Sequence, residues 1–201
     1  MITVVDYDAG NLHSVVNALK YLGIPAKISS DPDEVADAQK LILPGVGAFG
    51  DAMEQLKSRG LDTALKDAAG KGTPLLGICL GLQVLFERSE ESPGAQGLGI
   101  LKGEILHIPP EGGLKIPHIG WNSLHLCNDG RLFRDVPENT YVYFVHSYYL
   151  KAADDQIVKA TTEYGVEIHA SVEQGNVFAT QFHPEKSSRV GMRILRNFCN
   201  I

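Results

Sequence analysis

The chain has 201 residues, 44% of them hydrophobic and 21% charged, which is ordinary for one globular domain. Its formal net charge of −6, without a basic run, gives no reason to expect nucleic acid or an anionic membrane as a partner. The sequence also lacks an apolar run of the roughly 20 residues that cross a bilayer, a signal-peptide pattern and an even set of cysteines, so we expect a cytoplasmic protein with reduced thiols.

Short apolar runs alternate with helical patterns along the first half of the chain. Strands are predicted over residues 2–6, 26–29, 41–43 and 74–78, and helices over residues 11–22, 49–69 and 82–86. A further short helix is expected to begin with Asp31 as its N-cap and Pro32 as its first residue. Because each strand is apolar throughout, the pattern predicts a mainly parallel central sheet with helices on both faces.

The second half of the chain has a different pattern. Between residues 97 and 177, short strands are separated by Gly, Pro and an Asn-Asp-Gly turn, which indicates an antiparallel extension of the sheet. A final helix is predicted over residues 187–199, with Val190, Ile194, Leu195 and Phe198 facing inward. Since no repeat or linker interrupts the sequence, we predict a single three-layer α/β domain that spans residues 1–201.

Cys79 lies where an apolar strand passes directly into an apolar helix, in the segment Gly-Ile-Cys-Leu-Gly. This is the nucleophile-elbow pattern with cysteine in place of serine. The glycines are needed because strand and helix pass close together at a strained turn, and the helix N-terminus favours a thiolate. The N–H of Leu80 is placed to bind an oxyanion. A lone cysteine is more often a small buried hydrophobic residue, and we prefer that interpretation for Cys127 and Cys199.

A thiol nucleophile needs a base, and the base needs a group that fixes its tautomer. Among the seven histidines only His183 has such company, because it follows a strand-like run over residues 176–182 and precedes Pro184 and Glu185. The proline fixes the backbone so that one imidazole edge can face Glu185 while the other reaches the thiol. Taken alone, this segment could equally be a strand end followed by a solvated helix.

The two motifs together resemble the class I glutamine amidotransferases. The resemblance extends from Ile2 to the last helix and implies a flavodoxin-like fold, with glutamine as the substrate. It implies that Cys79 is the nucleophile, that His183 is the general base and acid, and that Glu185 orients His183.

Five segments, in the expected order, resemble one subfamily of these enzymes, the glutaminase subunits of imidazole glycerol phosphate synthase in histidine biosynthesis. They lie at residues 6–12, 43–50, 87–94, 117–122 and 183–187. The resemblance implies a heterodimer with a cyclase subunit of (β/α)8-barrel fold, to which ammonia passes through a protected channel. The cyclase would then make imidazole glycerol phosphate and an aminoimidazole carboxamide ribotide.

Further positions acquire roles in oxyanion and substrate binding. The glycine-rich backbone at Val46 and Gly47 can approach a small substrate, and in the family the Val46 peptide rotates to give the oxyanion hole a second N–H. Without the resemblance this segment is an ordinary tight turn. Gln83, one helical turn after Cys79, is expected to hydrogen-bond the substrate. Glu91 is expected to pair with the substrate ammonium, although such a residue is more often a solvated charge.

Two more groups of positions take their roles from the resemblance. The backbone at Ser147 and Tyr148 is expected to hold the glutamine. The partner subunit is expected to contact Asn11, His118, Gly120, Trp121 and Lys186. A lone Trp is usually part of the core, but one that follows Gly in a Pro-bounded loop also suits an interface. No cofactor or metal is expected, because the sequence has no P-loop, dinucleotide fingerprint or metal-ligand spacing.

Three alternatives stay open from the sequence. The chain could be another ammonia-donating glutaminase, such as the subunit of pyridoxal phosphate synthase, although the strand-end motif there differs from Pro-Gly-Val-Gly. It could be a cysteine peptidase or thioesterase that uses the same triad. It could also be a catalytically silent binding subunit, but the intact Cys79, His183 and Glu185 argue against this interpretation.

Overall fold

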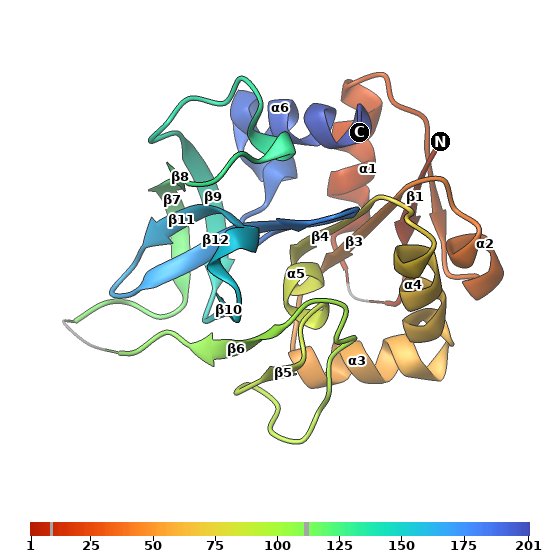
Figure 1. The fold of residues 1–201 in the computed structure, drawn as a ribbon, viewed down its shortest axis with the longest axis horizontal. Coiled ribbons are helices and arrows are strands. Elements are labelled where there is room, and N and C mark those ends of the chain that lie inside the picture. Colours follow the sequence, from red (N-terminus) through yellow and green to blue (C-terminus); the bar gives the residue numbers. More distant parts are fainter. Residues whose placement is uncertain (9, 111–112) are drawn as a thin grey trace.

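A central eight-stranded sheet organises the protein, and the computed structural model describes residues 1–8, 10–110 and 113–201 (Figure 1). Its strand order is β2-β1-β3-β4-β13-β12-β11-β8. The strands are β1 (Ile2–Val5), β2 (Ala26–Ser29), β3 (Leu41–Gly45), β4 (Leu75–Cys79), β8 (His125–Leu126), β11 (Val158–Glu163), β12 (Glu167–Gln174) and β13 (Val177–Thr180). Ala9 of the predicted opening segment, and residues 111–112 of the second half, lie outside the described residues.

The direction of the strands divides this sheet into two parts. Strands β2, β1, β3, β4 and β13 are parallel to one another, whereas β12, β11 and β8 continue the sheet in antiparallel order. The predicted parallel sheet with an antiparallel extension is therefore confirmed. In parallel sheets the carboxyl ends of the strands meet at one edge, where ligands bind. The ends of β1, β3, β4 and β13 consequently meet at one such edge.

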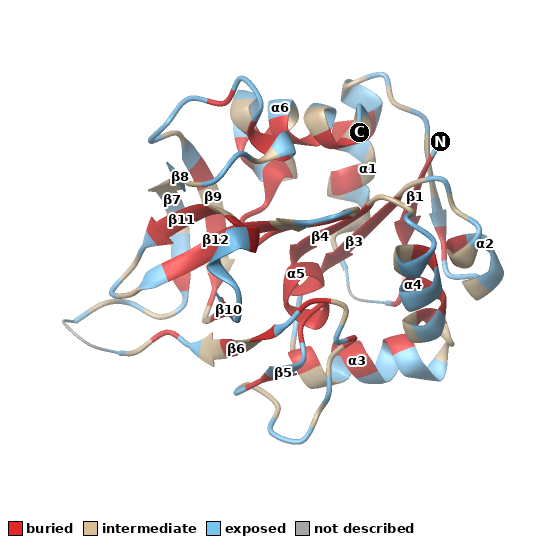
Figure 2. Ribbon diagram, viewed as in Figure 1, coloured by how far each residue is buried: buried red, intermediate tan, exposed pale blue. Residues whose placement is uncertain are grey.

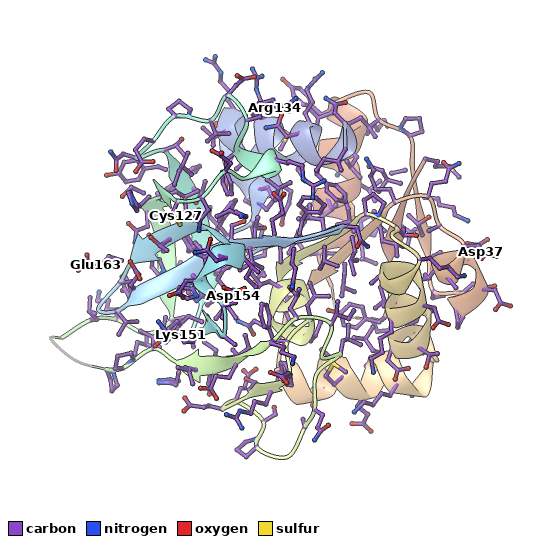
Figure 3. The ribbon with its side chains drawn as sticks, in the orientation of Figure 1. Asp37, Cys127, Arg134, Lys151, Asp154 and Glu163 are labelled. Atoms are coloured by element: carbon purple, nitrogen blue, oxygen red, sulfur yellow. The ribbon has the colours of Figure 1, made fainter. Side chains whose placement is uncertain are left out.

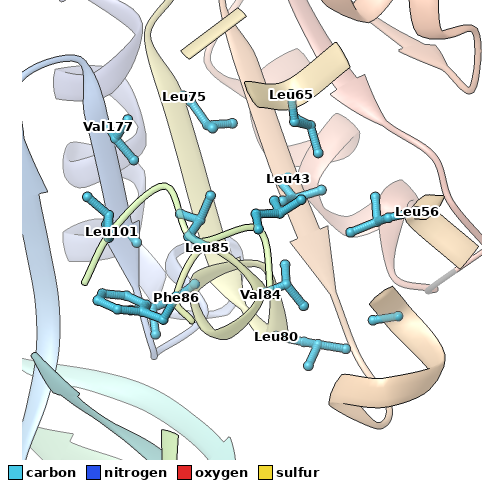
Figure 4. Packing of buried hydrophobic residues seen from close by; sticks show 14 of the residues in the cluster. Leu43, Leu56, Leu65, Leu75, Leu80, Val84, Leu85, Phe86, Leu101 and Val177 are labelled. Carbon is cyan, nitrogen blue, oxygen red and sulfur yellow. The ribbon is translucent and has the colours of Figure 1, made fainter. Parts of the chain in front are cut away.

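Helices cover both faces of the sheet, as the apolar strands predict (Figure 1). Two of them pack on one face: α1 (Leu12–Tyr21) and α6 (Ser188–Cys199). The other face carries α2 (Pro32–Ala36), α3 (Phe49–Ser58), α4 (Leu61–Gly70) and α5 (Leu80–Val84). Buried residues line the central strands (Figure 2), and Figure 4 shows the packing of Leu43, Leu65 and Phe86 in the core on this second face.

The helix boundaries confirm some sequence expectations and correct others. Asp31 caps α2 as predicted, because its carboxylate accepts the N–H groups of Asp33 and Glu34. The helix predicted over residues 49–69 is instead two helices, α3 and α4. Gly60 separates them with φ of 71°, a left-handed conformation that costs glycine little. The prediction overlooked this glycine as a helix break.

Two small sheets extend the fold beside the antiparallel part. Strands β5 (Arg88–Ser89), β6 (Gly103–His107) and β10 (Tyr148–Ala152) form one, and β7 (His118–Ser123) pairs with β9 (Tyr141–His146) in the other. Short 3-10 helices occupy Arg131–Phe133, Asp155–Ile157 and Pro184–Lys186. Cys127 lies against β11, with its sulfur 3.7 Å from the Val158 carbonyl oxygen (Figure 3). Among the described residues, no helix has the length and apolar character needed to span a membrane.

Candidate active site

Cys79 sits at a strained turn between β4 and α5. Its φ of 55° and ψ of −108° are rare for a non-glycine residue, and such strain persists only where the surrounding structure imposes it. A Cβ at Gly81 would lie 1.8 Å from the Leu43 carbonyl oxygen, and one at Gly77 would lie 2.6 Å from the Gly81 carbonyl oxygen. Both glycines are therefore required by close backbone approach, as the elbow pattern predicts.

His183 and Glu185 form a buried pair at the same edge of the sheet. The distance between His183 Nδ1 and Glu185 Oε1 is 2.8 Å, and both side chains are almost fully buried. Because a carboxylate accepts, Nδ1 carries a proton and Nε2 is the nitrogen available to the sulfur. Nε2 has no hydrogen-bond partner among the described residues. Burial lowers the pKa of His183, but the adjacent Cys79 sulfur and the Glu185 carboxylate outweigh it and raise that pKa to about 9.

The chain around His183 is held by backbone contacts with β9. The His183 N–H donates to the Tyr143 carbonyl at 3.0 Å, and Ser187 Oγ donates to the His183 carbonyl at 2.6 Å. The same Oγ accepts the Tyr143 N–H at 3.0 Å. A Cβ at Gly191 would lie 1.8 Å from the Pro184 carbonyl oxygen, so α6 begins in close contact with this turn. These contacts place the imidazole beside the elbow.

Asn11 also contacts the pair. Its Nδ2 donates to Glu185 Oε1 at 3.0 Å, so this oxygen accepts hydrogen bonds from both Asn11 and His183. Glu185 Oε2 is buried and has no partner among the described residues. Asn11 has a left-handed backbone with φ of 66°, and its side chain does not cap α1. Asn11, which is expected at the partner interface, is therefore also connected to His183 through Glu185.

The sulfur of Cys79 has two further polar neighbours. Gln181 Nε2 lies 3.7 Å from Sγ, and the Val145 carbonyl oxygen lies 3.8 Å away. Gln181 Oε1 accepts from Gln83 Nε2 at 3.1 Å, and the same Nε2 donates to the Tyr148 carbonyl at 3.1 Å. The Gln83 donors are thus engaged inside the chain, which leaves only its Oε1 for the predicted contact with substrate.

Two buried histidines continue this hydrogen-bonded chain on the other side of Tyr148. His146 Nδ1 donates to the Tyr148 carbonyl at 2.9 Å, so His146 Nε2 must accept from His118 Nδ1 at 3.1 Å. The tautomers follow from the carbonyl oxygen, which can only accept. Burial lowers the pKa of His118 to about 4 and that of His146 to about 3. Both rings are consequently neutral at pH 7.

A cavity of about 270 Å³ opens between these groups. It is lined by Val46, Gly47, Cys79, Leu80, Gln83, Glu91, Pro117, Val145, His146, Ser147, Tyr148 and His183. The expected nucleophile and base, both positions expected in the oxyanion hole and all five positions expected to bind substrate therefore lie together. Leu80 is the first residue of α5, so its N–H has no partner within that helix. Such an N–H can donate a hydrogen bond to a developing oxyanion.

Glu91 has a structural contact that its sequence position did not reveal. Its Oε2 accepts the N–H of Phe49 at 2.7 Å and thereby caps the N-terminus of α3. The neighbouring Ser92 Oγ accepts the Gly50 N–H at 3.0 Å. Because each carboxylate oxygen can accept two hydrogen bonds, this contact still leaves Glu91 able to pair with a substrate ammonium, as expected from the sequence.

The positions expected at the partner interface divide by exposure. Trp121 is 52% exposed, Lys186 is exposed, and Gly120 is partly exposed. His118 is only 3% exposed, because it stacks between Phe144 and Tyr164. The His118 side chain is therefore buried within this chain, and a contact of this position with the partner subunit stays a prediction. Its neighbour on the open face of β7 is Ile119, which is 61% exposed.

Sequence reasoning missed Gln181 and His146 as parts of this site. Gln181 precedes His183 by two residues, and in extended backbone such residues share a side, which could have indicated it. His146 ends the aromatic run of β9, where a polar residue in an apolar segment was the only available signal. Among the described residues, no group of three or more His, Cys, Asp or Glu side chains is arranged to hold a metal ion.

Comparison with known proteins gives concordant results. Residues 3–201 match the family described as glutamine amidotransferase class-I. The chain is 50% identical over 197 residues to the imidazole glycerol phosphate synthase subunit HisH of Moorella thermoacetica, a match that covers 98% of this chain and 93% of that protein. It is 49% identical over 201 residues to the protein of the same name from Methanothermobacter thermautotrophicus, with coverage of 100% and 98%.

Solved structures share the fold at lower sequence identity. A crystal structure of a glutamine amidotransferase has a TM-score of 0.77 at 22% identity, covering 100% of this chain and 98% of that one. The structure of PurLQS from Thermotoga maritima has a TM-score of 0.77 at 24% identity, covering 99% and 97%. At these identities the likeness concerns the fold alone.

Proposed function

The chain belongs to the class I glutamine amidotransferase family, and from this premise we propose that Cys79, His183 and Glu185 are the triad with which it hydrolyses glutamine. The main support for the proposal is that these three residues meet at one cavity. Cys79 and His183 line the cavity, and Glu185 accepts a hydrogen bond from His183 Nδ1 on the side away from it. A buried carboxylate that accepts Nδ1–H leaves Nε2 directed at the nucleophile, as a cysteine triad requires.

The first half of the reaction uses the sulfur and the oxyanion hole. The Cys79 thiol gives its proton to His183 Nε2, its sulfur attacks the side-chain amide carbon of glutamine, and the carbonyl oxygen takes up the electron pair of the C=O bond and becomes an oxyanion. The N–H of Leu80 stabilises that oxygen, joined by the N–H of Val46 once its peptide is oriented inward. Donors aimed at the developing charge commonly contribute about 10²–10³ each to the rate.

The second half of the reaction uses His183. The imidazolium gives its Nε2 proton to the departing ammonia, which leaves a thioester between Cys79 and the glutamyl group. The neutral imidazole then takes a proton from water, whose oxygen attacks the thioester and releases glutamate. Glu185 keeps the tautomer correct and balances the charge of the imidazolium in both steps.

The physiological role follows from the full-length relatives. The chain is the glutaminase subunit of an imidazole glycerol phosphate synthase, since about half of its residues are identical to proteins of that name along nearly the whole length of both chains. As a subunit it acts in a complex. Our finer proposal is a heterodimer with a (β/α)8-barrel cyclase, which receives the ammonia through a channel. Exposed Trp121 and Lys186 support a contact surface near the site.

We also propose one domain over residues 1–201, because a single sheet contains strands from both halves of the chain. Cys79, Cys127 and Cys199 are free thiols, which supports the cytoplasmic location that we propose.

The test of the triad is a substitution of Cys79 in the complex. Cys79→Ala is expected to abolish glutamine-dependent synthesis and to leave synthesis from an ammonium salt intact, because the nucleophile serves only to release ammonia. Cys127→Ala is the matched control, since that thiol lies away from the cavity against β11. Retained glutamine-dependent synthesis by Cys79→Ala would contradict the proposal.

A further inference from the structure

We propose that Gln181 is a catalytic residue of this glutaminase: its side-chain amide donates a hydrogen bond to the Cys79 sulfur, in an orientation imposed through Gln83 by the carbonyl of Tyr148. The inference rests on the proposed function, because it takes Cys79 as the nucleophile. It adds a donor to the triad from a residue that the reaction as described above does not use.

The starting observation is the contact between two buried side chains. Gln181 Nε2 lies 3.7 Å from Cys79 Sγ, within the range of hydrogen bonds to sulfur. Gln181 is fully buried and Cys79 is 7% exposed, so water does not compete strongly for this contact. A glutamine amide could in principle present either its oxygen or its nitrogen to the sulfur, so the orientation needs separate evidence.

The orientation of the Gln181 amide is decided by the Tyr148 carbonyl oxygen, to which it is linked through Gln83. The Tyr148 carbonyl can only accept, so Gln83 must present its NH₂ group to it, at 3.1 Å. The same Gln83 nitrogen lies 3.1 Å from Gln181, which must therefore present Oε1 to it. The remaining end of the Gln181 amide is the NH₂ group, and that end faces Cys79 Sγ. Turning either amide around would place two donors or two acceptors together in a buried site.

The anchor of this chain is itself saturated. His146 Nδ1 donates to the same Tyr148 carbonyl at 2.9 Å, so both lone pairs of the oxygen are used. His118 Nδ1 in turn donates to His146 Nε2. Because both acceptor positions of the Tyr148 carbonyl are filled, the Gln83 amide stays hydrogen-bonded to it in one orientation. The amide of Gln181 is consequently held in one orientation before substrate arrives.

The chemical consequence is a sulfur held by groups on two sides. Gln181 donates to Sγ from one direction, and His183 Nε2 is the nitrogen available to it from another. An N–H donor favours the thiolate over the thiol and keeps Sγ in the position from which it attacks. The hydrogen bond raises the fraction of thiolate but also makes that thiolate a weaker nucleophile. The second effect cancels roughly half of the first on a logarithmic scale. We therefore expect an effect of about threefold to tenfold on the reactivity of the sulfur.

The experiment separates the role of this donor from the glutaminase reaction itself. In the full-length chain, the rate at which iodoacetamide alkylates Cys79 is measured for wild type and for Gln181→Met, with Cys127 and Cys199 replaced by Ala in both. The methionine has similar volume and no donor. Alkylation is expected to slow about threefold to tenfold. In the complex, kcat for glutamine should fall by at least as much while KM changes little, since the donor contacts the nucleophile and not the substrate.

A matched control and a second variant complete the design. The control is Thr180→Val, which removes a buried hydroxyl from the residue next to Gln181. That hydroxyl donates to the Phe182 carbonyl at 3.1 Å, and its loss should leave the alkylation rate unchanged. Gln83→Met does not touch the sulfur but frees Gln181 to turn, so it should also slow alkylation. This second variant decides the matter if Gln181→Met no longer binds the partner subunit and has therefore lost its fold.

The outcomes are distinguishable. Unchanged or faster alkylation of Gln181→Met, in a variant that still binds the partner subunit, would overturn the assignment of Gln181. Alkylation that slows as expected in a protein whose wild type releases no glutamate would instead overturn the proposed function and leave the donor in place.

Discussion

Asn11 and His183 share one oxygen of Glu185: Asn11 Nδ2 lies 3.0 Å from Oε1, and His183 Nδ1 lies 2.8 Å from it. Glu185, the residue that we propose orients the base, is thus itself oriented from the segment that follows β1. We expect Asn11→Ala to lower kcat several-fold, because Glu185 loses its second donor while Oε2 already lacks a partner within the described part of the chain. Steady-state glutamate release measures this effect. Exposed Asn17 on α1 supplies the control substitution Asn17→Ala, and an equal loss in both variants would exclude a specific role for Asn11.

The pH dependence of glutamine hydrolysis should report the charge of His183. Its pKa is raised to about 9, so the imidazolium that protonates the departing ammonia is present at neutral pH and disappears as the pH rises through about 9. The rate should fall over that range. Glu185→Gln removes the negative charge that contributes to the raised pKa, so the decline should move to lower pH. A pH–rate profile of both proteins tests this, and coincident profiles would contradict the assigned role of Glu185.

The buried histidine pair should make the protein sensitive to acid. The folded-state pKa values of His118 and His146 are lowered to about 4 and about 3, so the unfolded chain binds more protons below about pH 6.5. Stability is therefore full above that pH and is lost as the pH falls toward 4, by about 2 kcal/mol per histidine at pH 5.

Urea unfolding at pH 7 and pH 5 measures this loss. His118→Phe keeps an aromatic ring in the stack but cannot titrate, so its loss between the two pH values should be smaller than that of wild type. Exposed His13 gives the control variant His13→Gln, which should keep the loss of wild type. The same loss in His118→Phe would show that the acid sensitivity arises elsewhere.

Tyr7, at the end of β1, has a buried hydroxyl without a hydrogen-bond partner among the described residues. Burial raises the pKa of this hydroxyl, and the nearby Cys79 sulfur adds to the increase. An unsatisfied buried donor costs about 1–3 kcal/mol, so Tyr7→Phe should raise the free energy of unfolding by about 1 kcal/mol. Tyr164→Phe is the contrasting control, because the Tyr164 hydroxyl donates to the Lys115 carbonyl at 2.7 Å and its loss should destabilise the protein. Destabilisation by both variants would refute this view of Tyr7.

Activation by the partner subunit is expected from the segment that follows β3. Val46 is 41% exposed and Gly47 has φ of 104°, so the segment that carries the N–H expected in the oxyanion hole is exposed where it leaves β3. A missing donor costs about 10²–10³ in rate, so the isolated chain should be slow. Adding the partner, and then its nucleotide ligand, should raise glutamate release in steps. A ligand of the partner can do this only if it binds the active arrangement more tightly.

The interface residues should control that activation. Trp121→Ala and Lys186→Ala are expected to reduce the stepwise rise without changing the slow rate of the isolated chain. Tyr21, which is 81% exposed at the end of α1, provides the control Tyr21→Ala. If glutamate release is the same with and without the partner, the chain is a constitutive glutaminase and the expectation fails.

Much of the fold followed from local sequence. The apolar strands predicted a parallel sheet, and the order of strands and helices is as expected, because a strand buried on both faces must be apolar throughout. The elbow glycines and the turn at His183 could also be predicted, since backbone close approach and proline geometry depend on adjacent residues. The break at Gly60 was missed, because a glycine within a long helical pattern does not by itself reveal a left-handed conformation.

The contacts between side chains from distant segments were decided only by the tertiary structure. Asn11 reaches Glu185 across 174 positions of sequence, and Gln181 reaches Cys79 across 102. No local pattern encodes such pairs, because they depend on the order of β1, β4 and β13 in the sheet. The sequence by itself was enough to propose which residues carry the chemistry: a cysteine at an elbow, and a histidine with its carboxylate. The tertiary structure decided how each is oriented, since a hydrogen bond has direction only when both partners are in place.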